Sequence, residues 1–184
     1  MLRCPWAESS PAMRGYHDRE WGVPSHDERH LFEMLTLEGA QAGLSWATIL
    51  NRRDGYLSAF AAFDPAKVAA FDDRRLERLR QDEGIIRNRL KIYSTRTNAV
   101  AVLHLQAEFG SFATYLWNWV DGRTIVNQPR TLADLRPTTE LSDRISEDLK
   151  RRDFTFVGST IVYSLLQAVG IVDDHLVGCP FKQR

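Results

Sequence analysis

A chain of 184 residues is long enough to bury one substantial hydrophobic core, or at most two small ones. Hydrophobic residues make up 43% and charged residues 26%, as in an ordinary globular domain, and no apolar run approaches the roughly 20 residues that span a bilayer. Basic and acidic residues number 24 each, so the net charge of zero does not by itself indicate a nucleic-acid partner. The composition therefore excludes a disordered chain and favours a protein without membrane segments.

Capping residues and helical periodicity dominate the N-terminal half. Ser25 and Glu28 form a capping-box pattern, which predicts a helix that buries Leu31, Met34 and Leu35 at helical spacing. Three further helix starts follow, each at a residue type that favours the N-cap position. They are Ser45 for a helix over 46–52, Asp64 with Pro65 for a second helix, and Asp72 or Asp73 for a third that ends at Arg80.

The C-terminal half is also predicted to be helical, and the whole chain to be one all-α domain over 1–184. A long helix follows the break at 82–85 and ends at Gly110, a typical C-terminal stop. Its buried side is predicted to be Ile86, Leu90, Tyr93, Val100 and Leu103. Residues 121–141 predict a loop, and no segment alternates as a strand does. Ser111 predicts the start of an aromatic helix, Ser142 the start of another, and Ser159 or Thr160 the start of the last, which ends at Gly170.

Residues 76–92 have the pattern of a helix-hairpin-helix, inside a basic stretch of seven arginines and one lysine between Arg74 and Arg96. Gly84 permits a close turn, and the amides that begin the second helix can hold a DNA phosphate. Arg87, Arg89 and Lys91 lie near these amides and can add charge-assisted contacts. An ordinary helical hairpin with a basic exterior fits the same pattern. The apolar residues that would pack the two helices together are Leu76, Leu79, Ile85 and Ile86.

Two cysteines and two histidines lie in pairs near the two ends of the chain. Cys4 precedes His17, and His175 precedes Cys179 at a spacing that suits one half of a zinc site. The first residues lack the basic and apolar regions of a signal peptide, so a cytoplasmic protein without a disulfide is expected. Four such ligands would fill a tetrahedral shell and leave no open position for catalysis. Two buried thiols and two hydrogen-bonded histidines are the alternative.

The signatures of catalytic zinc enzymes are incomplete in this sequence. A zinc deaminase needs a pair of closely spaced cysteines, and Cys4 and Cys179 lie far apart. A zincin protease needs His-Glu-x-x-His, which the sequence lacks. If a metal is bound, it is therefore expected to join the two ends of the chain and stabilise the fold.

Two segments, 16–24 and 37–46, combine aromatic and acidic side chains. Glu38 continues the apolar face of the predicted helix over 31–37, where a carboxylate costs several kcal/mol unless it is paired or meets a polar ligand. An extruded nucleobase needs aromatic faces for stacking and a polar group for its edge, and these segments supply both. The alternative is a capping or salt-bridged Glu38 with Trp21 and Trp46 as core residues.

The sequence resembles the bacterial 3-methyladenine DNA glycosylase I family, a group of helix-hairpin-helix glycosylases. The resemblance covers essentially the full chain, and its motifs are together highly specific. They are Arg3-Cys4, Tyr16-His17-Asp18-x-Glu20-Trp21-Gly22-Val23-Pro24, Leu37-Glu38-Gly39-x-Gln41-Ala42-Gly43-Leu44-Ser45-Trp46, Phe63-Asp64-Pro65-x-Lys67-Val68-Ala69, Gly84-Ile85-Ile86-Arg87, Phe156-Val157-Gly158-x-Thr160 and Asp174-His175-x-Val177-Gly178-Cys179.

The resemblance implies a role for each of several residues. Glu38 is implied to be the catalytic residue of a base pocket, and a structural Zn²⁺ is implied at the joined ends of the chain. DNA contacts are implied at the turn after Glu38, which would fill the gap left by the extruded nucleotide, and at the hairpin. The implied residues are Tyr16, Trp46, Trp21 and Trp6 in the pocket, Gln41, Gly43, Leu44, Gly84, Arg87 and Arg89 on DNA, and Cys4, His17, His175 and Cys179 on zinc.

The resemblance also implies a reaction, the excision of 3-methyladenine from alkylated duplex DNA by a monomeric enzyme. Many relatives with this hairpin use a downstream aspartate, whereas no aspartate occurs here between Asp82 and Asp121. We therefore expect dependence on the lability of the methylated base. Lys91 is the only lysine in that interval, so a monofunctional enzyme that leaves an abasic site is expected. The alternatives are a non-enzymatic DNA-binding module and a zinc hydrolase acting on a small molecule.

Overall fold

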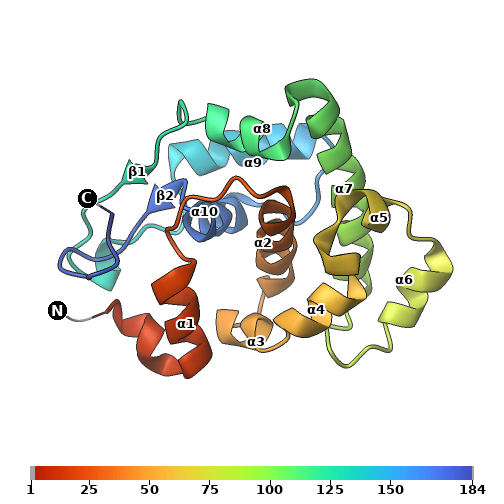
Figure 1. The fold of residues 1–184 in the computed structure, drawn as a ribbon, viewed down its shortest axis with the longest axis horizontal. Helices are drawn as coiled ribbons and strands as arrows, with labels where there is room; N and C mark the ends of the chain where they lie inside the picture. The colour runs from red at the N-terminus through yellow and green to blue at the C-terminus, as the bar shows by residue number, and fades with distance from the viewer. Residues whose placement is uncertain (1–2, 184) are drawn as a thin grey trace.

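The computed structural model describes residues 3–183, and the prediction of a mostly helical protein is confirmed (Figure 1). Two-residue strands, β1 and β2, pair in parallel and are the only strands within this range. None of the described helices is both long and apolar enough to cross a membrane. The elements are η1 Pro5–Ser9, α1 Pro11–Arg19, α2 Glu28–Gln41, α3 Trp46–Leu50, α4 Arg53–Ala59, η2 Ala61–Phe63, α5 Pro65–Ala69, α6 Asp73–Leu79, α7 Arg89–Phe109, α8 Phe112–Asn118, β1 Ile125–Val126, η3 Leu132–Asp134, α9 Glu140–Arg151, α10 Ser159–Ala168 and β2 Val172–Asp173, where η marks a short 3-10 helix.

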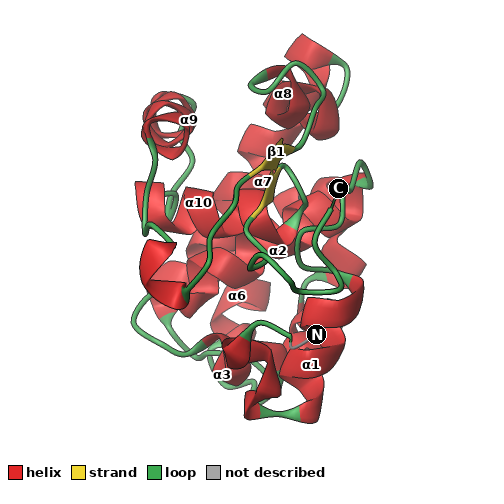
Figure 2. Cartoon of the chain, turned by 90° about the vertical axis from the view of Figure 1, so that its left-hand side faces the viewer, coloured by secondary structure: helices red, strands yellow, loops and turns green. Residues whose placement is uncertain are grey.

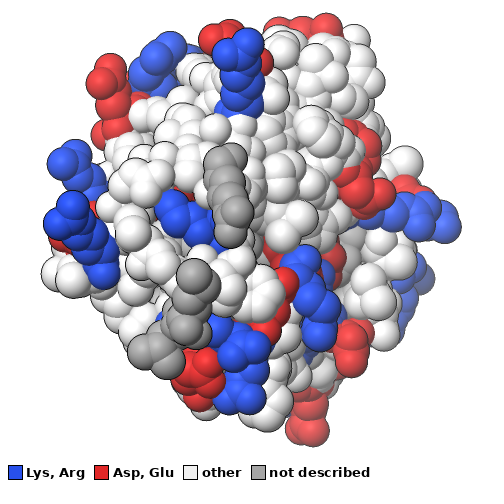
Figure 3. Space-filling view, turned by 60° about the vertical axis from the view of Figure 1, so that its left-hand side comes forward, with Lys and Arg blue, Asp and Glu red and all other residues white. Residues whose placement is uncertain are grey.

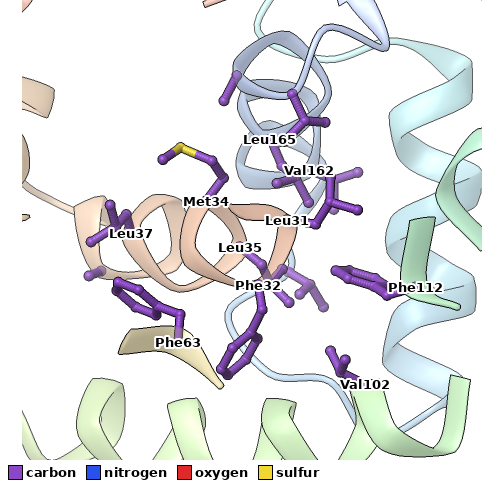
Figure 4. Packing of buried hydrophobic residues seen from close by; sticks show 14 of the residues in the cluster. Leu31, Phe32, Met34, Leu35, Leu37, Phe63, Val102, Phe112, Val162 and Leu165 are labelled. Atoms are coloured by element: carbon purple, nitrogen blue, oxygen red, sulfur yellow. The ribbon is translucent and has the colours of Figure 1, made fainter. Parts of the chain in front are cut away.

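Helix α2 lies at the centre of the hydrophobic core. Every residue from Leu31 to Ala40 is buried, because α7, α8 and α10 surround the helix and η2 packs beside it. Figure 4 shows apolar side chains of α2 meeting Phe63, Val102, Phe112 and others. A helix buried on all sides is expected to be apolar on all sides, so the buried carboxylate of Glu38 within α2 requires an explanation.

The two ends of the described chain meet on one side of the molecule. Helix α1 and the strand pair lie at this side together with both termini, and α4 to α6 lie at the opposite side (Figures 1 and 2). Strand β2 follows α10 directly and pairs with β1, so Ile125 lies opposite Val172. This pairing holds the C-terminal segment against the loop that follows α8.

The predicted cap of helix α2 is wrong by two residues. Helix α2 is capped by Asp27, whose carboxylate accepts a hydrogen bond from the His30 amide, and Ser25 is not its cap. The carboxylate of Glu28 instead accepts hydrogen bonds from the amides of Phe112 and Ala113, at the start of α8. A tertiary contact to free helix-end amides has thus replaced the local capping box.

Of the capping residues predicted for the other helices, some are wrong and some are confirmed. Thr139 caps α9, and Ser142 takes the N3 position of that capping box. Gly158 precedes α10, in place of Ser159 or Thr160. Ser45, Asp64, Asp72 and Ser111 do cap the helices α3, α5, α6 and α8, as predicted.

The predicted buried face of the long helix is wrong. Helix α7 starts only at Arg89, after the N-cap Asn88, so Ile86 lies outside it. Leu90 is 65% exposed and Val100 is 39% exposed. The residues of α7 that face the core are Ile92, Thr95, Asn98, Ala99, Ala101, Val102 and Leu105.

A polar side chain, that of Asn98, explains why the face of α7 that meets the core differs from the predicted one. The amide group of Asn98 donates to the Thr155 carbonyl at 2.9 Å and accepts from the Thr155 amide at 2.8 Å. Because the donor and the acceptor of its side-chain amide are both hydrogen-bonded, Asn98 is tolerated on the core face of α7. Apolar residues on other faces of the helix, such as Leu90 and Val100, then point toward solvent. The segment over 121–141, predicted as a loop, contains β1 and η3.

The hairpin between α6 and α7 packs tightly against α4. Leu76, Leu79 and Ile85 are buried, and the Tyr56 hydroxyl accepts a hydrogen bond from the Ile86 amide. A Cβ added to Gly55 in α4 would lie 2.2 Å from the Gly84 carbonyl oxygen, far inside van der Waals contact. The glycine pair therefore allows helix and turn to meet backbone to backbone.

Replacing Gly55 by alanine is expected to destabilise the protein by about 2 kcal/mol or more, because the overpacked backbone contact outweighs the gain in helix propensity. Gly15→Ala is the matched control, since it also lies within a helix and its added Cβ meets only the flexible guanidinium of Arg19. Urea denaturation of both variants measures the difference. Equal stability of the two would contradict the close contact at the hairpin.

Candidate functional site

A cavity of about 290 Å³ opens between α1, α2, α3 and α10. Most of its wall is aromatic or aliphatic, and one carboxylate, that of Glu38, lies in it. The cavity therefore has the shape and chemistry of a site for a small, flat, polar-edged molecule. Its lining residues are Trp6, Met13, Tyr16, Trp21, Glu38, Gln41, Trp46, Leu135, Ser164 and Gln167.

Four aromatic residues reach this cavity from separate elements and contact one another. The ring centroids of Tyr16 and Trp46 lie 5.2 Å apart, and those of Trp6 and Trp21 lie 4.9 Å apart. Trp6 also lies 6.4 Å from Tyr16 and so joins the two pairs. Such a cluster can stack on a planar ligand and can attract a cation through the ring quadrupoles.

Glu38 is 4% exposed and has no ion-pair or side-chain hydrogen-bond partner among the described residues. Burial raises the pKa of its carboxyl group to about 8. A salt-bridged or capping glutamate is therefore not what the structure contains. An ionised carboxylate in this position is stabilised only by a ligand that brings positive charge or hydrogen-bond donors.

Four lining residues were not predicted from the sequence, namely Met13, Leu135, Ser164 and Gln167. Ser164 and Gln167 lie three residues apart, on one face of α10. The side-chain amide of Gln167 donates to the Asp174 carboxylate at 2.6 Å. This spacing was the one available signal, and it could not be assigned to a cavity without the position of α10 beside α2.

Asp174 is a buried centre of hydrogen bonds behind this wall. Its carboxylate accepts hydrogen bonds from the hydroxyl of Tyr163 at 2.6 Å and from the side-chain amide of Asn127 at 2.7 Å, besides the one from Gln167. Two donors from α10 and one from the segment after β1 therefore converge on one carboxylate, which fixes the orientation of the Gln167 side chain at the cavity.

The residues expected on DNA lie on two exposed segments. Gln41 lines the cavity, and Gly43 and Leu44 follow it in an exposed turn, with Gly43 at a φ of +78°. Arg87 and Arg89 are exposed beside the hairpin, where their guanidinium groups lie 3.8 Å from Glu83 and 3.6 Å from Glu77. Both segments can therefore reach a large partner.

The pairs of cysteines and histidines at the two ends of the chain also come together. Sγ of Cys4, Nε2 of His17 and Sγ of Cys179 all lie within 4.8 Å of one another. The His175 ring centroid lies 4.8 Å from that of His17, and Nε2 of His175 is buried without a hydrogen-bond partner among the described residues. Both cysteines are free thiols, so no disulfide joins them.

Carboxylates orient both histidines. Nδ1 of His17 lies 2.8 Å from Asp18, and Nδ1 of His175 lies 2.7 Å from Asp173. Nε2 of each ring is then the nitrogen left to bind a metal, the arrangement usual around zinc-bound histidines. Burial, with the adjacent Cys179, raises the pKa of the Cys4 thiol to about 11. The sulfurs of Cys4 and Cys179 and Nε2 of His17 form a three-member cluster that can hold a metal ion, and the orphaned Nε2 of His175 offers the fourth ligand atom of a tetrahedral site.

Comparison with known proteins identifies the class to which this fold and cavity belong. Residues 6–183 match the family model described as methyladenine glycosylase. The chain belongs to this family, and it is a glycosylase enzyme of DNA repair.

The relatives carry more particular names. The chain is 48% identical over 179 residues to DNA-3-methyladenine glycosylase 1 of Escherichia coli K12, covering 97% of this chain and 96% of the relative. It is 41% identical over 180 residues to DNA-3-methyladenine glycosylase of Haemophilus influenzae, covering 98% and 97%.

A solved structure extends the similarity to the fold. The 3-methyladenine DNA glycosylase I of Staphylococcus aureus, whose structure addresses the recognition of 3-methyladenine, superposes with a TM-score of 0.95 at 35% identity. The similarity covers 98% of this chain and 96% of that one.

Proposed function

We propose that this chain is a monofunctional DNA glycosylase that removes 3-methyladenine from alkylated duplex DNA by base flipping and leaves an abasic site for base excision repair. The observation that carries the proposal is the ligand-facing carboxylate of Glu38, buried without a counter-ion in an aromatic cavity. The relatives named for 3-methyladenine, and the S. aureus structure concerned with its recognition, support the same substrate.

Charge complementarity explains the choice of base. Methylation at N3 gives adenine in DNA a formal positive charge, which an unmethylated base lacks. Tyr16 and Trp46 can attract this cation through their ring faces, at roughly 0.5–2 kcal/mol for each contact. The carboxylate of Glu38 accepts hydrogen bonds from the donor edge of the base and offsets its charge. A base within the duplex stack is covered by its neighbours, so the nucleotide is proposed to leave the duplex to enter the cavity.

The bond that breaks joins C1′ of the sugar to N9 of the base. The bonding electron pair leaves with the base, which becomes neutral 3-methyladenine. Water then adds to the oxocarbenium-like sugar at C1′ and releases a proton to solvent, so the atoms and charges balance. Because the positive charge already makes the base a good leaving group, the reaction proceeds without the downstream aspartate that the interval between Asp82 and Asp121 lacks.

The state of the one lysine in that interval supports the proposal of base release without strand cleavage. A lyase reaction needs a free amine to attack C1′. The ammonium group of Lys91 donates to the carbonyls of Ala40 and Ala42, both at 2.7 Å. An ammonium group held by these two carbonyl acceptors has no lone pair with which to attack C1′ and form a Schiff base.

DNA binding is proposed to use the hairpin and the turn after α2. Gly84, Arg87 and Arg89 lie where the first amides of α7 can meet a phosphate, and such contacts position a protein without reading sequence. Gln41, Gly43 and Leu44 are proposed to fill the space left by the extruded nucleotide. Acidic and basic side chains interleave on the face that Figure 3 presents, in agreement with the zero net charge.

Cys4, His17, His175 and Cys179 are proposed to hold a structural Zn²⁺. Bound there, the metal would supply no chemistry to the reaction and would link the N-terminal segment to the C-terminal one. We further propose that residues 1–184 form one domain, supported by a single continuous core, and that the enzyme acts as a cytoplasmic monomer.

The test is to incubate the protein with methylated duplex DNA, identify the released bases by chromatography and examine the strands on a denaturing gel. Release of 3-methyladenine is expected, with strand breaks only after alkali. Breaks without alkali would contradict monofunctionality. A folded sample that binds duplex DNA and releases no base would support the DNA-binding module instead.

A further inference from the structure

The turn that connects α2 to α3 is exposed over residues 42–45, although it adjoins the base cavity. Leu44 is 39% exposed, and its amide donates to the Gln41 carbonyl. The last carbonyls of a helix have no partner within the helix, so the end of α2 needs hydrogen-bond donors from elsewhere. Among the described residues, one side chain supplies them to residues 40–44, that of Lys91.

Lys91 belongs to the first turn of α7, directly after the hairpin. Its ammonium group donates to the carbonyl oxygens of Ala40 and Ala42, each at 2.7 Å, and it has no carboxylate partner within residues 3–183. A cation at this point is stabilised by the negative end of the α2 dipole as well as by the two hydrogen bonds. Its backbone amide is capped by Asn88 in the same turn of helix.

A second contact holds α2 to α7, but it lies deeper in the protein. Asn98 of α7 fixes Thr155 through its backbone, and the adjacent Phe156 lies 3.3 Å from a Cβ built on Gly39. This contact secures the buried part of the helix. Among the side-chain hydrogen bonds of the described residues, those of Lys91 are the ones that join the exposed turn to α7.

We propose that Lys91 is a positioning residue that couples the docking of DNA phosphates at the hairpin to the insertion of residues 41–44 into the duplex. The inference rests on the proposed function, because it gives these two segments their contacts with DNA. Lys91 has its backbone in the first turn of α7 and its ammonium group on the turn that connects α2 to α3. A phosphate that fixes the first turn of α7 thereby fixes the turn that must enter the duplex.

The test compares Lys91→Met, which keeps the length of the side chain and removes its charge, with Lys91→Arg. Lys67→Met is the matched control, because the Lys67 side chain is 68% exposed and pairs only with Asp64. Fluorescence anisotropy gives the dissociation constants for an undamaged duplex and for a duplex with a stable abasic-site analogue. A 2-aminopurine opposite that analogue reports insertion, and tryptophan quenching reports binding of free 3-methyladenine.

For Lys91→Met, the preference for the abasic duplex is expected to fall about tenfold, and excision at saturating enzyme to slow by a similar factor. Affinity for undamaged DNA and for the free base should stay within about twofold of the unmodified protein. Lys91→Arg is expected to restore part of the preference, and Lys67→Met to change none of these quantities.

Three results would overturn the coupling. In the first, Lys91→Met keeps its preference for the abasic duplex over the undamaged one. In the second, it loses affinity for the two duplexes equally, as expected for a simple phosphate contact. In the third, it also loses binding of free 3-methyladenine, as expected for a general structural role. These binding ratios are measured without base release. If the unmodified protein released no base at all, the proposed function would fail while the test of Lys91 remained decisive.

Discussion

Replacing Glu38 by glutamine is expected to lower the rate of 3-methyladenine excision about 100-fold, because the neutral amide no longer offsets the charge of the methylated base. The change keeps the size of the side chain, so the cavity should keep its shape. Single-turnover excision on methylated duplex DNA measures the effect, after subtraction of spontaneous base loss. Equal rates would move recognition of the base to Tyr16 and Trp46.

Glu33→Gln is the matched control for this variant. Glu33 lies on the same helix and is 9% exposed, but it pairs with Arg53 at 2.7 Å. Its replacement is expected to cost about 1–3 kcal/mol of stability, because Arg53 loses one of its two carboxylate partners and keeps only Glu20, and to leave excision largely intact. A similar loss of activity in both variants would mean that α2 tolerates no change of charge.

The pH dependence of excision follows from the same carboxyl group. Its pKa in the folded protein is raised to about 8, from an ordinary value of 4.5. As the pH rises toward 8 the carboxylate forms, so kcat/KM is expected to rise and then level off. Glu38→Gln should lack this rise. A cationic base favours the ionised form, so kcat should depend less on pH than kcat/KM does.

The stability of the protein should change in the opposite direction. Between pH 4.5 and about 8 the unfolded chain ionises Glu38 while the folded protein keeps it protonated. Stability is therefore lost as the pH rises through this window, and the loss is complete above the folded pKa. At pH 8.5, Glu38→Gln is expected to be more stable than the unmodified protein by on the order of a few kcal/mol.

Removal of the proposed zinc is the second change with a large expected effect. A chelator is expected to lower the melting temperature by about 10 °C or more, because a structural zinc contributes several kcal/mol to a fold of this size. Thermal unfolding with and without the chelator measures this, together with the metal content per chain. Restored zinc should restore the melting temperature and the activity together.

Ligand variants separate the possible roles of the metal. Cys4→Ser should lose bound zinc and melt at the temperature of the chelated protein, with no further response to the chelator. His175→Asn tests the fourth ligand, and full retention of zinc would exclude His175 from the site. Activity lost without any change in melting would favour the zinc-hydrolase alternative.

The sequence predicted the helices best where a cap acts locally. Asp64, followed by Pro65, satisfies its own helix end, and the structure keeps it there. Ser25 and Ser142 were plausible caps, but Asp27 and Thr139 take that position. A competing residue two or three positions away is enough to move a helix start, because each cap contributes only about 1 kcal/mol.

Other features depend on long-range contacts that local patterns do not contain. The predicted buried side of α7 followed apolar residues such as Leu90, whereas the tertiary partner of Asn98 decides which side faces the core. The two-residue strands form only because β1 meets β2, and neither is long enough to alternate. No bounds were predicted for α1 or α4. Helix α4 has no side-chain cap, whereas Ser10 followed by Pro11 caps α1 and was a local signal that was missed.

The residues of the candidate site came largely from the family resemblance. Spacing indicated a metal site at Cys4 and Cys179, and Glu38 was conspicuous on an apolar face. Ser164 and Gln167 were missed, because their place in the cavity wall depends on the packing of α10 against α2.

The meeting of the two chain ends has a consequence during synthesis on the ribosome. The ring centroids of Trp6 and His17 lie 5.1 Å apart, and those of Trp21 and His175 lie 4.6 Å apart. Two aromatic residues of the cavity wall therefore pack against the cysteine and histidine cluster that includes Cys179. A nascent chain already contains Glu38 and Trp46 long before Cys179 has emerged, since translation proceeds from the N-terminus at about 5–20 residues per second. The cavity is therefore assembled last, and a chain cut short near its end carries most of the site without its full enclosure.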